Sequence, residues 1–571
     1  MLVNSQKAQK GAGYDHQLQD HFAGLYARRL ASHQTAERIC DCRNLSWPRW
    51  RLGLRFALRY VASPDMDPIN FSSRRIFAIG PILLLSICLA FGQSSNHGTI
   101  EELRQLRLPD VVIETVSSVA PDVEKNPGRK AYAEVKGVIG EHIHFELLLP
   151  NEWNGRFVMG GGGGFVGSVQ NAARDSVNKG YATVGTDTGH QSQPGYMADW
   201  AQDNLEAQVN FGHLAVHRTA EVAKAIIRAH YRNDPAYSYF VGCSRGGGQA
   251  MMEAQRYPKD FDGVVAGAPA FNWTGIAATM VSIAKAFYPN PEHLDGTALT
   301  KDALQKLKEA ILEQCDSVDG LKDGVVQDPG SVHFDLSKVE GITDEQRKLI
   351  GAIYHGASNA KGQIVPGFTK GSECDPDQWI AWLVGPAPTL AKDHVPDLTF
   401  AFGTQIFKHL IFNNPNWDYS TYDFSTFERD SRLAASFLNA TNKNLDALKA
   451  RKGKLIIWHG WADPALPAQS TIDHYRQVLA HDPNAPEYCR LFMVPGCLHC
   501  GGGPGASEIY WLSVIVDWVE HSKAPDRLVV SKRERGKVTF TRPLFPYPQC
   551  AFYKGSGDTN SAESFLVKSP R

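Results

Sequence analysis

The chain has 571 residues, too many for one simple hydrophobic core, so we expect either a large domain with a sizeable insertion or two domains. Its formal net charge of -1 gives no electrostatic case for binding nucleic acid or an anionic membrane surface. Ten cysteines are few for this length, which excludes a dense disulfide scaffold but allows selected bridges in an exported protein.

The N-terminal part predicts export. An apolar run over 76–91 follows two arginines and ends in small residues, which predicts a secretory signal peptide over 66–92. A membrane anchor is the alternative, but the run is shorter than the ~20 residues of a usual spanning helix, so we expect no stable membrane span. Because signal peptides begin a chain, we expect translation to start at Met66, which makes 1–65 a non-native extension. The protein is then secreted or periplasmic.

Strand-like and helix-like segments alternate in the part that follows. Alternating apolar and polar residues over 131–138 and 142–149 predict a β-hairpin, and apolar positions recur at helical spacing over 213–230. We expect further strands at 156–159, 181–186, 237–242 and 263–267. Strands that alternate with helices predict a mainly parallel sheet covered on both faces.

The alternation stops after residue 270. The region 271–450 is rich in Pro, Asp, Asn and aromatic residues, with helical pieces at 301–314 and 344–354. The strand and helix pattern resumes at 454–458, 491–494 and 509–521. We therefore expect an inserted lid or substrate domain, and we divide the chain into a first core part at 93–270, a lid at 271–450 and a second core part at 451–571.

A serine stands where a strand meets a helix. Residues 242–246 read Gly-Cys-Ser-Arg-Gly, the Gly-x-Ser-x-Gly pattern, between a strand-like run and a helix-like stretch. Glycines on both sides let the backbone turn tightly and hold the serine hydroxyl above the sheet. This context predicts that Ser244 is a nucleophile rather than part of an ordinary turn.

A nucleophilic serine needs a base, and the base needs a partner that fixes its tautomer. In α/β-hydrolases these residues follow in the order Ser, Asp or Glu, His. Asp463 follows the strand at 454–458 and His499 follows the strand at 491–494, so both lie at strand ends, where such active sites form. For Asp463, a loop-capping role is the alternative. The histidines that rival His499 are His190, His459 and His481.

Two cysteines adjoin the predicted catalytic residues. Cys243 precedes Ser244, and Cys500 follows His499. If the serine and the histidine form a hydrogen bond, the Cα atoms of the cysteines fall within the ~4.4–6.8 Å that a disulfide spans. Export would allow such a bridge, which would join the two loops.

Three motifs together resemble the tannase/feruloyl esterase family of α/β-hydrolases, which includes mono(2-hydroxyethyl) terephthalate hydrolases. They are Gly-Cys-Ser-x-Gly-Gly at 242–247, His-Gly-x-x-Asp at 459–463 and Pro-Gly-x-x-His-Cys at 495–500. The resemblance extends over about 143–562. It implies an α/β-hydrolase fold with a large lid domain inserted between strands of the mainly parallel sheet.

The resemblance also implies roles for individual residues. Ser244, Asp463 and His499 would form the catalytic triad, and Cys243 and Cys500 would form the family's bridge between the nucleophile and base loops. Five other cysteines lack the partners that are usual in the family, so their pairing stays open. They are Cys315, Cys374, Cys489, Cys497 and Cys550.

Ester hydrolysis requires N–H donors ~2.7–3.1 Å from the oxyanion that forms on the substrate. We expect Arg245, the residue after the nucleophile, to supply one N–H group. We expect Gly163, in the glycine run 160–164, to supply the other. A flexible linker is the alternative for this run, and a nucleotide loop is disfavoured because no Lys-Ser/Thr follows it.

The loop over 315–325 carries three carboxylates, which suit a hard cation that prefers oxygen ligands. From composition alone, a solvated turn is the alternative. The resemblance implies a structural Ca²⁺ site in the lid, formed by the side chains of Asp316, Asp319 and Asp323 and the carbonyls of Leu321 and Val325.

The resemblance implies a secreted serine carboxylic-ester hydrolase that acts on small esters of hydroxycinnamic, gallic or terephthalic acids through an acyl-enzyme. Plant cell walls and tannins are the expected sources. Aromatic residues of the lid either stack on a phenolic ring or form the lid core: Trp379, Trp382, Phe402, Phe407 and Trp417. Two other classes stay open, a non-catalytic binding protein of this fold and a thiol oxidoreductase that uses Cys497 and Cys500.

Overall fold

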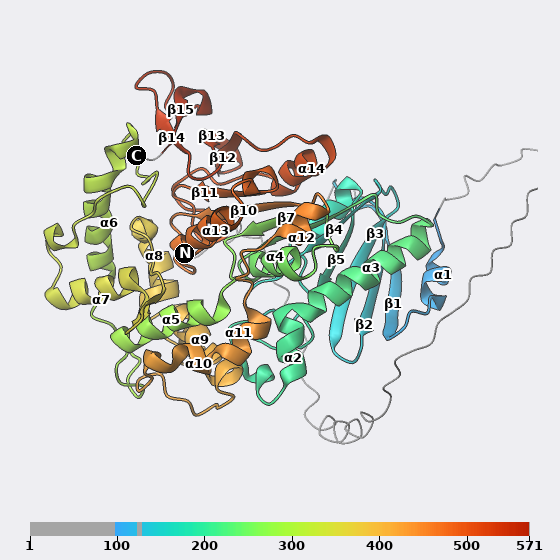
Figure 1. The fold of residues 1–571 in the computed structure, drawn as a ribbon, viewed down its shortest axis with the longest axis horizontal. Helices are drawn as coiled ribbons and strands as arrows, with labels where there is room; N and C mark the ends of the chain where they lie inside the picture. Colours follow the sequence, from blue (N-terminus) through green and yellow to red (C-terminus); the bar gives the residue numbers. More distant parts are fainter. Residues whose placement is uncertain (1–96, 123–127, 570–571) are drawn as a thin grey trace, which may run out of the picture. The chain divides into compact units, whose positions relative to one another are not determined.

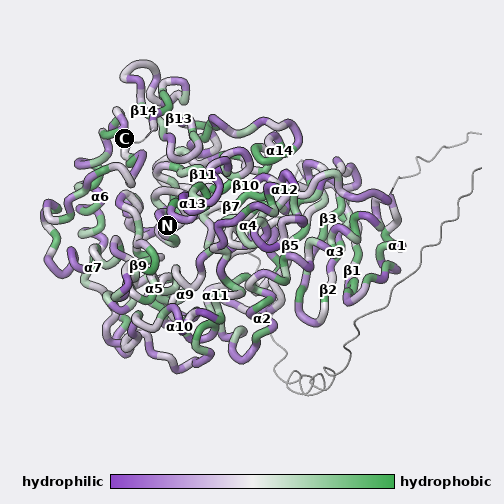
Figure 2. The backbone as a smooth tube through the Cα atoms, in the orientation of Figure 1, coloured by the Kyte–Doolittle hydropathy of each residue, from purple (hydrophilic) through white to green (hydrophobic). Residues whose placement is uncertain are grey.

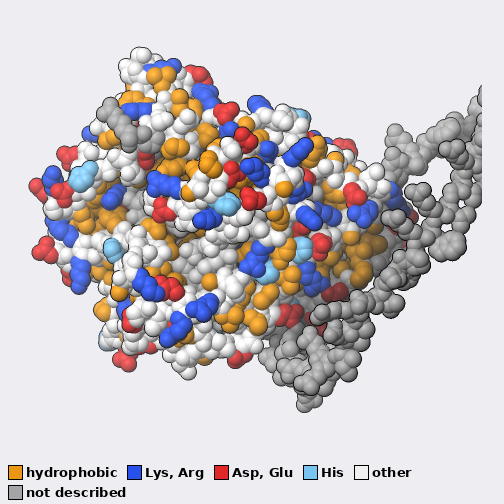
Figure 3. Space-filling view, in the orientation of Figure 1, with side chains coloured by type: hydrophobic (Ala, Val, Ile, Leu, Met, Phe, Trp, Pro, Cys, Tyr) orange, Lys and Arg blue, Asp and Glu red, His pale blue; other side chains and the backbone are white. Residues whose placement is uncertain are grey.

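The computed structural model describes residues 97–122 and 128–569. The predicted extension at 1–65 and signal peptide at 66–92 lie outside the described residues. Within the described part, no helix combines the length and the apolar composition needed to cross a bilayer. On the face shown in Figure 3, positive and negative side chains are interspersed, as the net charge of -1 suggests.

A nine-stranded sheet organises the described part of the chain, in the order β1-β2-β3-β5-β4-β6-β7-β10-β11 (Figure 1). From β5 to β11 neighbouring strands are parallel, whereas β1, β2 and β3 pair antiparallel. The β2–β3 pair confirms the predicted hairpin. The strands are β1 (Val111–Val119), β2 (Tyr132–Ile139), β3 (Ile143–Pro150), β4 (Arg156–Gly160), β5 (Ala182–Thr186), β6 (Tyr237–Cys243), β7 (Gly263–Gly267), β10 (Lys454–Gly460) and β11 (Cys489–Val494).

Helices cover both faces of this sheet, as predicted for parallel strands. Val158 and Val265 pack with α14 (Trp511–His521) on one face. Their neighbours Met159 and Ala266 point to the other face, because side chains alternate along a strand. That second face is covered by α3 (Ala215–Tyr231), α4 (Arg245–Arg256) and α13 (Ala468–His481). Hydrophobic and hydrophilic residues both occur along α3 in Figure 2, as expected for a helix with one buried side.

The region between β7 and β10 is an insertion, because these two strands are direct neighbours in the sheet. We call residues 268–453 the inserted segment. Its larger helices gather on one side of Figure 1, away from β1 to β3, around a hydrophobic core of their own. These helices are α5 (Trp273–Phe287), α6 (Lys301–Cys315), α7 (Asp344–His355), α9 (Leu398–Gln405) and α11 (Arg432–Leu438). Helices α6 and α7 confirm the helical pieces predicted at 301–314 and 344–354.

The described residues include three π-helical turns, a rare conformation that often occurs at functional sites. They are η5 (Asn210–Leu214), η9 (Ile380–Val384) and η11 (Ile406–Ile411). The first precedes α3 in the core, and the other two lie in the inserted segment. All three contribute to the site described next.

Candidate active site

Ser244 occupies a strained turn between β6 and α4. Its backbone has φ 61° and ψ −123°, far from the conformations that L-residues favour. The turn is fixed because the Ser244 N–H donates to Gly267 O at 3.0 Å and the Ser244 carbonyl accepts from the Ala270 N–H at 2.9 Å. Gly242 is required here, since a Cβ would lie 2.4 Å from the Gly246 carbonyl. This is the geometry of a nucleophile elbow.

Asp463 and His499 meet at the ends of β10 and β11. His499 Nδ1 lies 2.8 Å from Asp463 Oδ2, and the N–H groups of Ala465 and Leu466 donate to Asp463 Oδ1 at 2.8 and 3.0 Å. Burial alone would raise the pKa of Asp463, but the charge of His499 and hydrogen bonds from His499 and His459 outweigh it and hold this pKa below its ordinary value. Asp463 is therefore an ionised, buried acceptor for the imidazole of His499.

His459, considered above as a rival base, is instead a second partner of Asp463. Its Nε2 lies 3.1 Å from Asp463 Oδ2, and its Nδ1 lies 2.8 Å from Thr471 Oγ1. The side chain is almost completely buried and does not line the pocket that holds the serine. Its position four residues before Asp463 at the end of a strand was visible in the sequence, but its role as an anchor of the carboxylate was not predicted.

The two remaining rivals of His499 have other partners. His190 is buried, stacks on Trp200 at 3.6 Å between ring centres, and contacts Phe165 O at 2.9 Å through Nε2. His481 lies 3.6 Å from Asp446. Neither lines the pocket that holds the serine.

Ser244 and His499 line the same pocket, which encloses about 450 Å³ of partly open space. No hydrogen bond joins their side chains among the described residues, and such contacts often tighten only when substrate binds. The other lining residues are mostly apolar or aromatic: Gly164, Arg245, Ala270, Trp273, Ile276, Met280, Trp382, Phe402, Ile406, Ala465 and Leu466.

The predicted disulfide is confirmed, since Cys243 and Cys500 are bonded with their Cα atoms 5.8 Å apart. It ties the turn that carries Ser244 to the loop that carries His499. Because Cys500 is bonded to Cys243, it is not available to a redox pair with Cys497. The Cys497 thiol is fully buried, and burial raises its pKa to about 12. The free cysteines among the described residues are Cys315, Cys374, Cys489, Cys497 and Cys550.

The glycine run after β4 requires a correction for Gly163. Its N–H donates to Gln170 Oε1 at 2.7 Å, so this group is already engaged, and the Gly162 N–H donates to Gln249 Oε1 at 3.1 Å. Gly164, not Gly163, lines the pocket with the serine. Only glycine fits there, because φ is +57° and a Cβ would lie 2.5 Å from Gly195 O.

Arg245 contributes more than the backbone N–H group that was predicted. As the first residue of α4, it has an N–H group without an acceptor inside the helix. Its side chain is 1% exposed, and Nη2 donates to the carbonyls of Phe211 and Gly212 in η5. The guanidinium carbon lies 4.2 Å from the ring centre of Phe211 and 5.4 Å from that of Trp273. Burial lowers the pKa of Arg245 to about 9, which leaves the side chain charged at neutral pH.

Two of the five aromatic residues predicted for the lid lie at this pocket. The Trp382 ring meets the His499 ring edge to face at 5.3 Å and lies nearly parallel to Phe402 at 6.2 Å. Trp379 and Phe407 are completely buried in the core of the inserted segment. Trp417 stacks on Phe407 at 4.8 Å. These three residues are therefore core residues, which was the alternative reading.

The acidic loop contains buried carboxylates that already have partners. Asp316 accepts the N–H groups of Asp323, Gly324 and Val325, while Asp323 pairs with Arg542 at 2.7 Å. Burial, with smaller effects from its acidic neighbours, raises the pKa of Asp319 to about 7. In the described part of the chain, no group of three or more His, Cys, Asp or Glu side chains is arranged to hold a metal ion.

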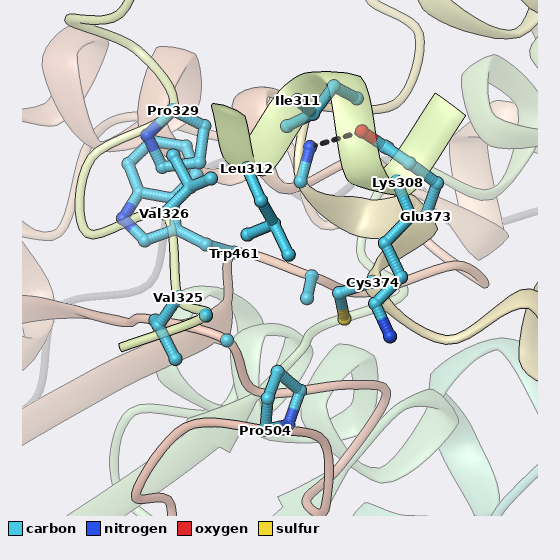
Figure 4. Close-up of a pocket in the computed structure, with 14 residues that line it drawn as sticks. Lys308, Ile311, Leu312, Val325, Val326, Pro329, Glu373, Cys374, Trp461 and Pro504 are labelled. Atoms are coloured by element: carbon cyan, nitrogen blue, oxygen red, sulfur yellow. Dashed lines mark hydrogen bonds between the residues drawn. The ribbon is translucent and has the colours of Figure 1, made fainter. Parts of the chain in front are cut away.

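A second pocket lies where the inserted segment meets the catalytic loops (Figure 4). Glu373 and Cys374 line it from the inserted segment, and Trp461 and Pro504 line it from the core. The dashed line in Figure 4 marks the hydrogen bond that the Gly371 N–H donates to Glu373 Oε1, at 2.8 Å. Burial raises the Glu373 pKa to about 7. The pocket includes neither Ser244 nor His499, so it is a packing seam rather than the reaction site.

A strained serine after β6, with a buried Asp–His pair from the loops after β10 and β11 of a mainly parallel sheet, defines an α/β-hydrolase. The family model described as "Tannase and feruloyl esterase" matches residues 131–567. The chain therefore belongs to the tannase and feruloyl esterase family, and it is a carboxylic ester hydrolase.

Individual relatives agree with this assignment. A probable feruloyl esterase of Arthroderma benhamiae is 33% identical, with 73% of this chain and 81% of the relative covered. A mono(2-hydroxyethyl) terephthalate hydrolase of Piscinibacter sakaiensis is 29% identical, with 79% and 87% covered. The crystal structure of an esterase from Aspergillus oryzae superposes with a TM-score of 0.72 at 25% identity, covering 81% of this chain and 98% of that one.

Proposed function

We propose that this hydrolase is a serine esterase that cleaves esters of aromatic acids through an acyl-enzyme. One observation carries the proposal: the buried Asp463–His499 pair opens onto the pocket that holds Ser244 in its strained turn. A serine, a histidine and an acid arranged in this way perform acyl transfer on unrelated folds.

The mechanism follows from the geometry. Ser244 Oγ attacks the ester carbonyl while His499 Nε2 takes the hydroxyl proton, and the Nδ1–H of His499 stays on Asp463. The carbonyl electron pair moves to oxygen, where the N–H groups of Arg245 and Gly164 serve as donors, with Gly164 replacing Gly163 in this role. His499 then protonates the leaving alcohol. Water, activated by the same imidazole, releases the acid from Ser244.

The substrate class is part of the same proposal. Trp273, Trp382 and Phe402 line the pocket, and flat aromatic surfaces suit an aromatic acyl group. The names of the relatives point to feruloyl and terephthalate esters, and the family's name adds tannins, which are esters of gallic acid. In this proposal the inserted segment is a lid, because it places Trp382 against His499 and Phe402 behind Trp382.

Export is proposed as well. The bonded Cys243–Cys500 pair is typical of proteins that fold in an oxidising compartment. We therefore propose a secreted or periplasmic enzyme.

We also propose that Ca²⁺ stabilises the acidic loop, and that on binding the carboxylates of Asp316 and Asp323 exchange their present partners for the ion. The donor set consists only of oxygen atoms, from the side chains of Asp316, Asp319 and Asp323 and the carbonyls of Leu321 and Val325, which suits this ion. Support comes from Asp319, a buried carboxylate beside other acids that a cation would neutralise. Calcium should raise the melting temperature of chelator-treated protein, and Asp319→Asn should remove most of that rise. An unchanged melting temperature would contradict the site.

Hydrolysis of methyl ferulate, methyl gallate and mono(2-hydroxyethyl) terephthalate tests the function. We expect turnover of at least one of these esters, loss of that turnover in Ser244→Ala, and labelling of Ser244 by a fluorophosphonate. A folded protein that hydrolyses none of the three and is not labelled would instead be a binding protein of this fold.

A further inference from the structure

The guanidinium of Arg245 is a buried positive charge that no carboxylate neutralises. It is 1% exposed, it forms no ion pair with any described residue, and no neighbouring charge contributes to its pKa. Burying an unpaired ion is costly, and replacing it with an apolar side chain of similar size is often neutral or stabilising. Stability therefore does not explain why an arginine stands at this position.

The surroundings of Arg245 solvate the cation without neutralising it. Nη2 donates to the carbonyls of Phe211 and Gly212, and the faces of Phe211 and Trp273 adjoin the guanidinium. Nε and Nη1 have no hydrogen-bond partner among the residues that the structure describes. Carbonyl dipoles and aromatic faces stabilise a cation but carry no negative charge of their own, so the electrostatic field of the guanidinium still acts on neighbouring groups.

The residue that carries this charge adjoins the reacting serine in the chain. Arg245 directly follows Ser244, lines the same pocket, and approaches the ring of Trp273, which also lines that pocket. The charge acts on nearby side chains. Burial is the main cause that lowers the pKa of His190 to about 3 and that of His213 to about 4, and the positive charge of Arg245 is a smaller cause in both. In such a low-dielectric region a fixed charge acts more strongly than it would in water.

We propose that the Arg245 side chain is a positioning residue that stabilises the oxyanion formed at Ser244 through its charge, without touching the substrate. This inference rests on the proposed serine mechanism. When the bond between Ser244 Oγ and the acyl carbon forms, the carbonyl π pair moves to oxygen and the hydroxyl proton moves to His499. The scissile ester group carries no net charge before this step, so the attraction to the charge that forms there favours the transition state over the bound substrate.

Replacing Arg245 with Met, which is apolar and fills much of the same space, tests the charge. We expect kcat to fall roughly tenfold to thirtyfold, the effect of a unit charge about 8–12 Å away at an effective dielectric of about 20, with KM changed less than about twofold. Arg245→Lys should retain more of the wild-type kcat than Arg245→Met while its ammonium is protonated, and should lose that advantage as the pH rises and the buried ammonium loses its proton. The melting temperatures of both variants are measured as well, because Arg245→Met removes a buried ion but also leaves the carbonyls of Phe211 and Gly212 without this donor.

A transition-state analogue separates this role from a structural one. An arylboronic acid forms a tetrahedral anion on a nucleophilic serine, so its affinity should weaken in Arg245→Met by the same factor as kcat. The affinity of the matching uncharged aryl amide should stay within about twofold. If Arg245→Met is not folded, Arg245→Gln replaces it in the same comparisons.

Three results would overturn the proposal. They are unchanged kcat in Arg245→Met, unchanged boronate affinity, or equal losses of kcat and melting temperature in the Met and Lys variants, which would indicate a packing role. Ester hydrolysis and Ser244 labelling of the wild type distinguish a failure of the serine mechanism from a failure of this inference alone. If it is inactive on every ester and Ser244 is not labelled, the serine mechanism fails and this inference fails with it. If the wild type is active and Arg245→Met matches it, only this inference fails.

Discussion

The Cys243–Cys500 bridge should contribute both to stability and to catalysis, and replacing both cysteines with serine tests this. The bridge closes a loop of 257 residues. In the chain-entropy description, a loop of this length corresponds to about 5 kcal/mol of stabilisation at 25 °C, and measured bridges often deliver less. Because the bonded residues adjoin Ser244 and His499, loss of the bridge should also let the two loops separate.

Urea unfolding followed by circular dichroism, together with steady-state ester hydrolysis, measures the two effects. We expect a lower urea midpoint and a lower kcat/KM for Cys243→Ser/Cys500→Ser. Cys374→Ser is the matched control, because Cys374 is a free cysteine of the inserted segment and its loss breaks no bond. A double variant with the midpoint and kcat/KM of the wild type would refute the view that the bridge aligns the two loops.

Three further predictions concern single residues. Asp463→Asn should lower kcat roughly 10³–10⁴-fold with the fold retained by circular dichroism, because an amide cannot hold the His499 tautomer; a loss below tenfold would contradict the triad. Trp382→Ala should raise KM roughly tenfold for aromatic esters and hardly at all for an acetyl ester of the same alcohol, and equal effects on both would argue against ring contact. Burial raises the pKa of Glu373 from its ordinary 4.5 to about 7, so its stabilising contribution is present below about pH 4.5 and is lost as the pH rises through about 7. At about 1.4 kcal/mol per unit of pKa shift, the stability lost on ionising Glu373 is up to about 3 kcal/mol. The urea midpoint of Glu373→Gln should therefore fall less than that of the wild type between pH 5 and pH 8, and an equal fall would contradict the prediction.

The strands of the sheet that are buried on both faces were predictable from sequence. In β5 and β7 every residue is buried; β7 appears as a continuous apolar run, and β5 combines alanine, valine and glycine with only two threonines. The edge strand β1 was not predicted: five of its nine residues are apolar, but they do not alternate regularly with the polar ones, and only Val116 is buried. The hairpin of β12 (Leu528–Glu534) and β13 (Lys537–Leu544) was missed for the same reason, since most of its residues are partly or fully exposed.

At the site, sequence order and strand ends located Ser244, Asp463 and His499 because the sheet itself brings these loops together. Which glycine of the run lines the pocket was not predictable. Five consecutive glycines cannot be told apart by sequence. Acceptors elsewhere in the chain, Gln170 and Gln249, decide which of their N–H groups are already engaged. The side chain of Arg245 also depends on distant partners, the carbonyls of η5.

The insertion between β7 and β10 has a consequence for how such enzymes diversify. Lys454 pairs with Gly263 and Trp458 pairs with Gly267, so the sheet fixes the start of the insertion at the carboxyl end of β7 and its end at the amino end of β10, whatever the intervening chain does. A different sequence can therefore be exchanged for the inserted segment without changing strand order. Chimeras that graft this segment from a relative onto this core are thus a direct way to transplant substrate preference while the hydrolytic residues outside it stay the same.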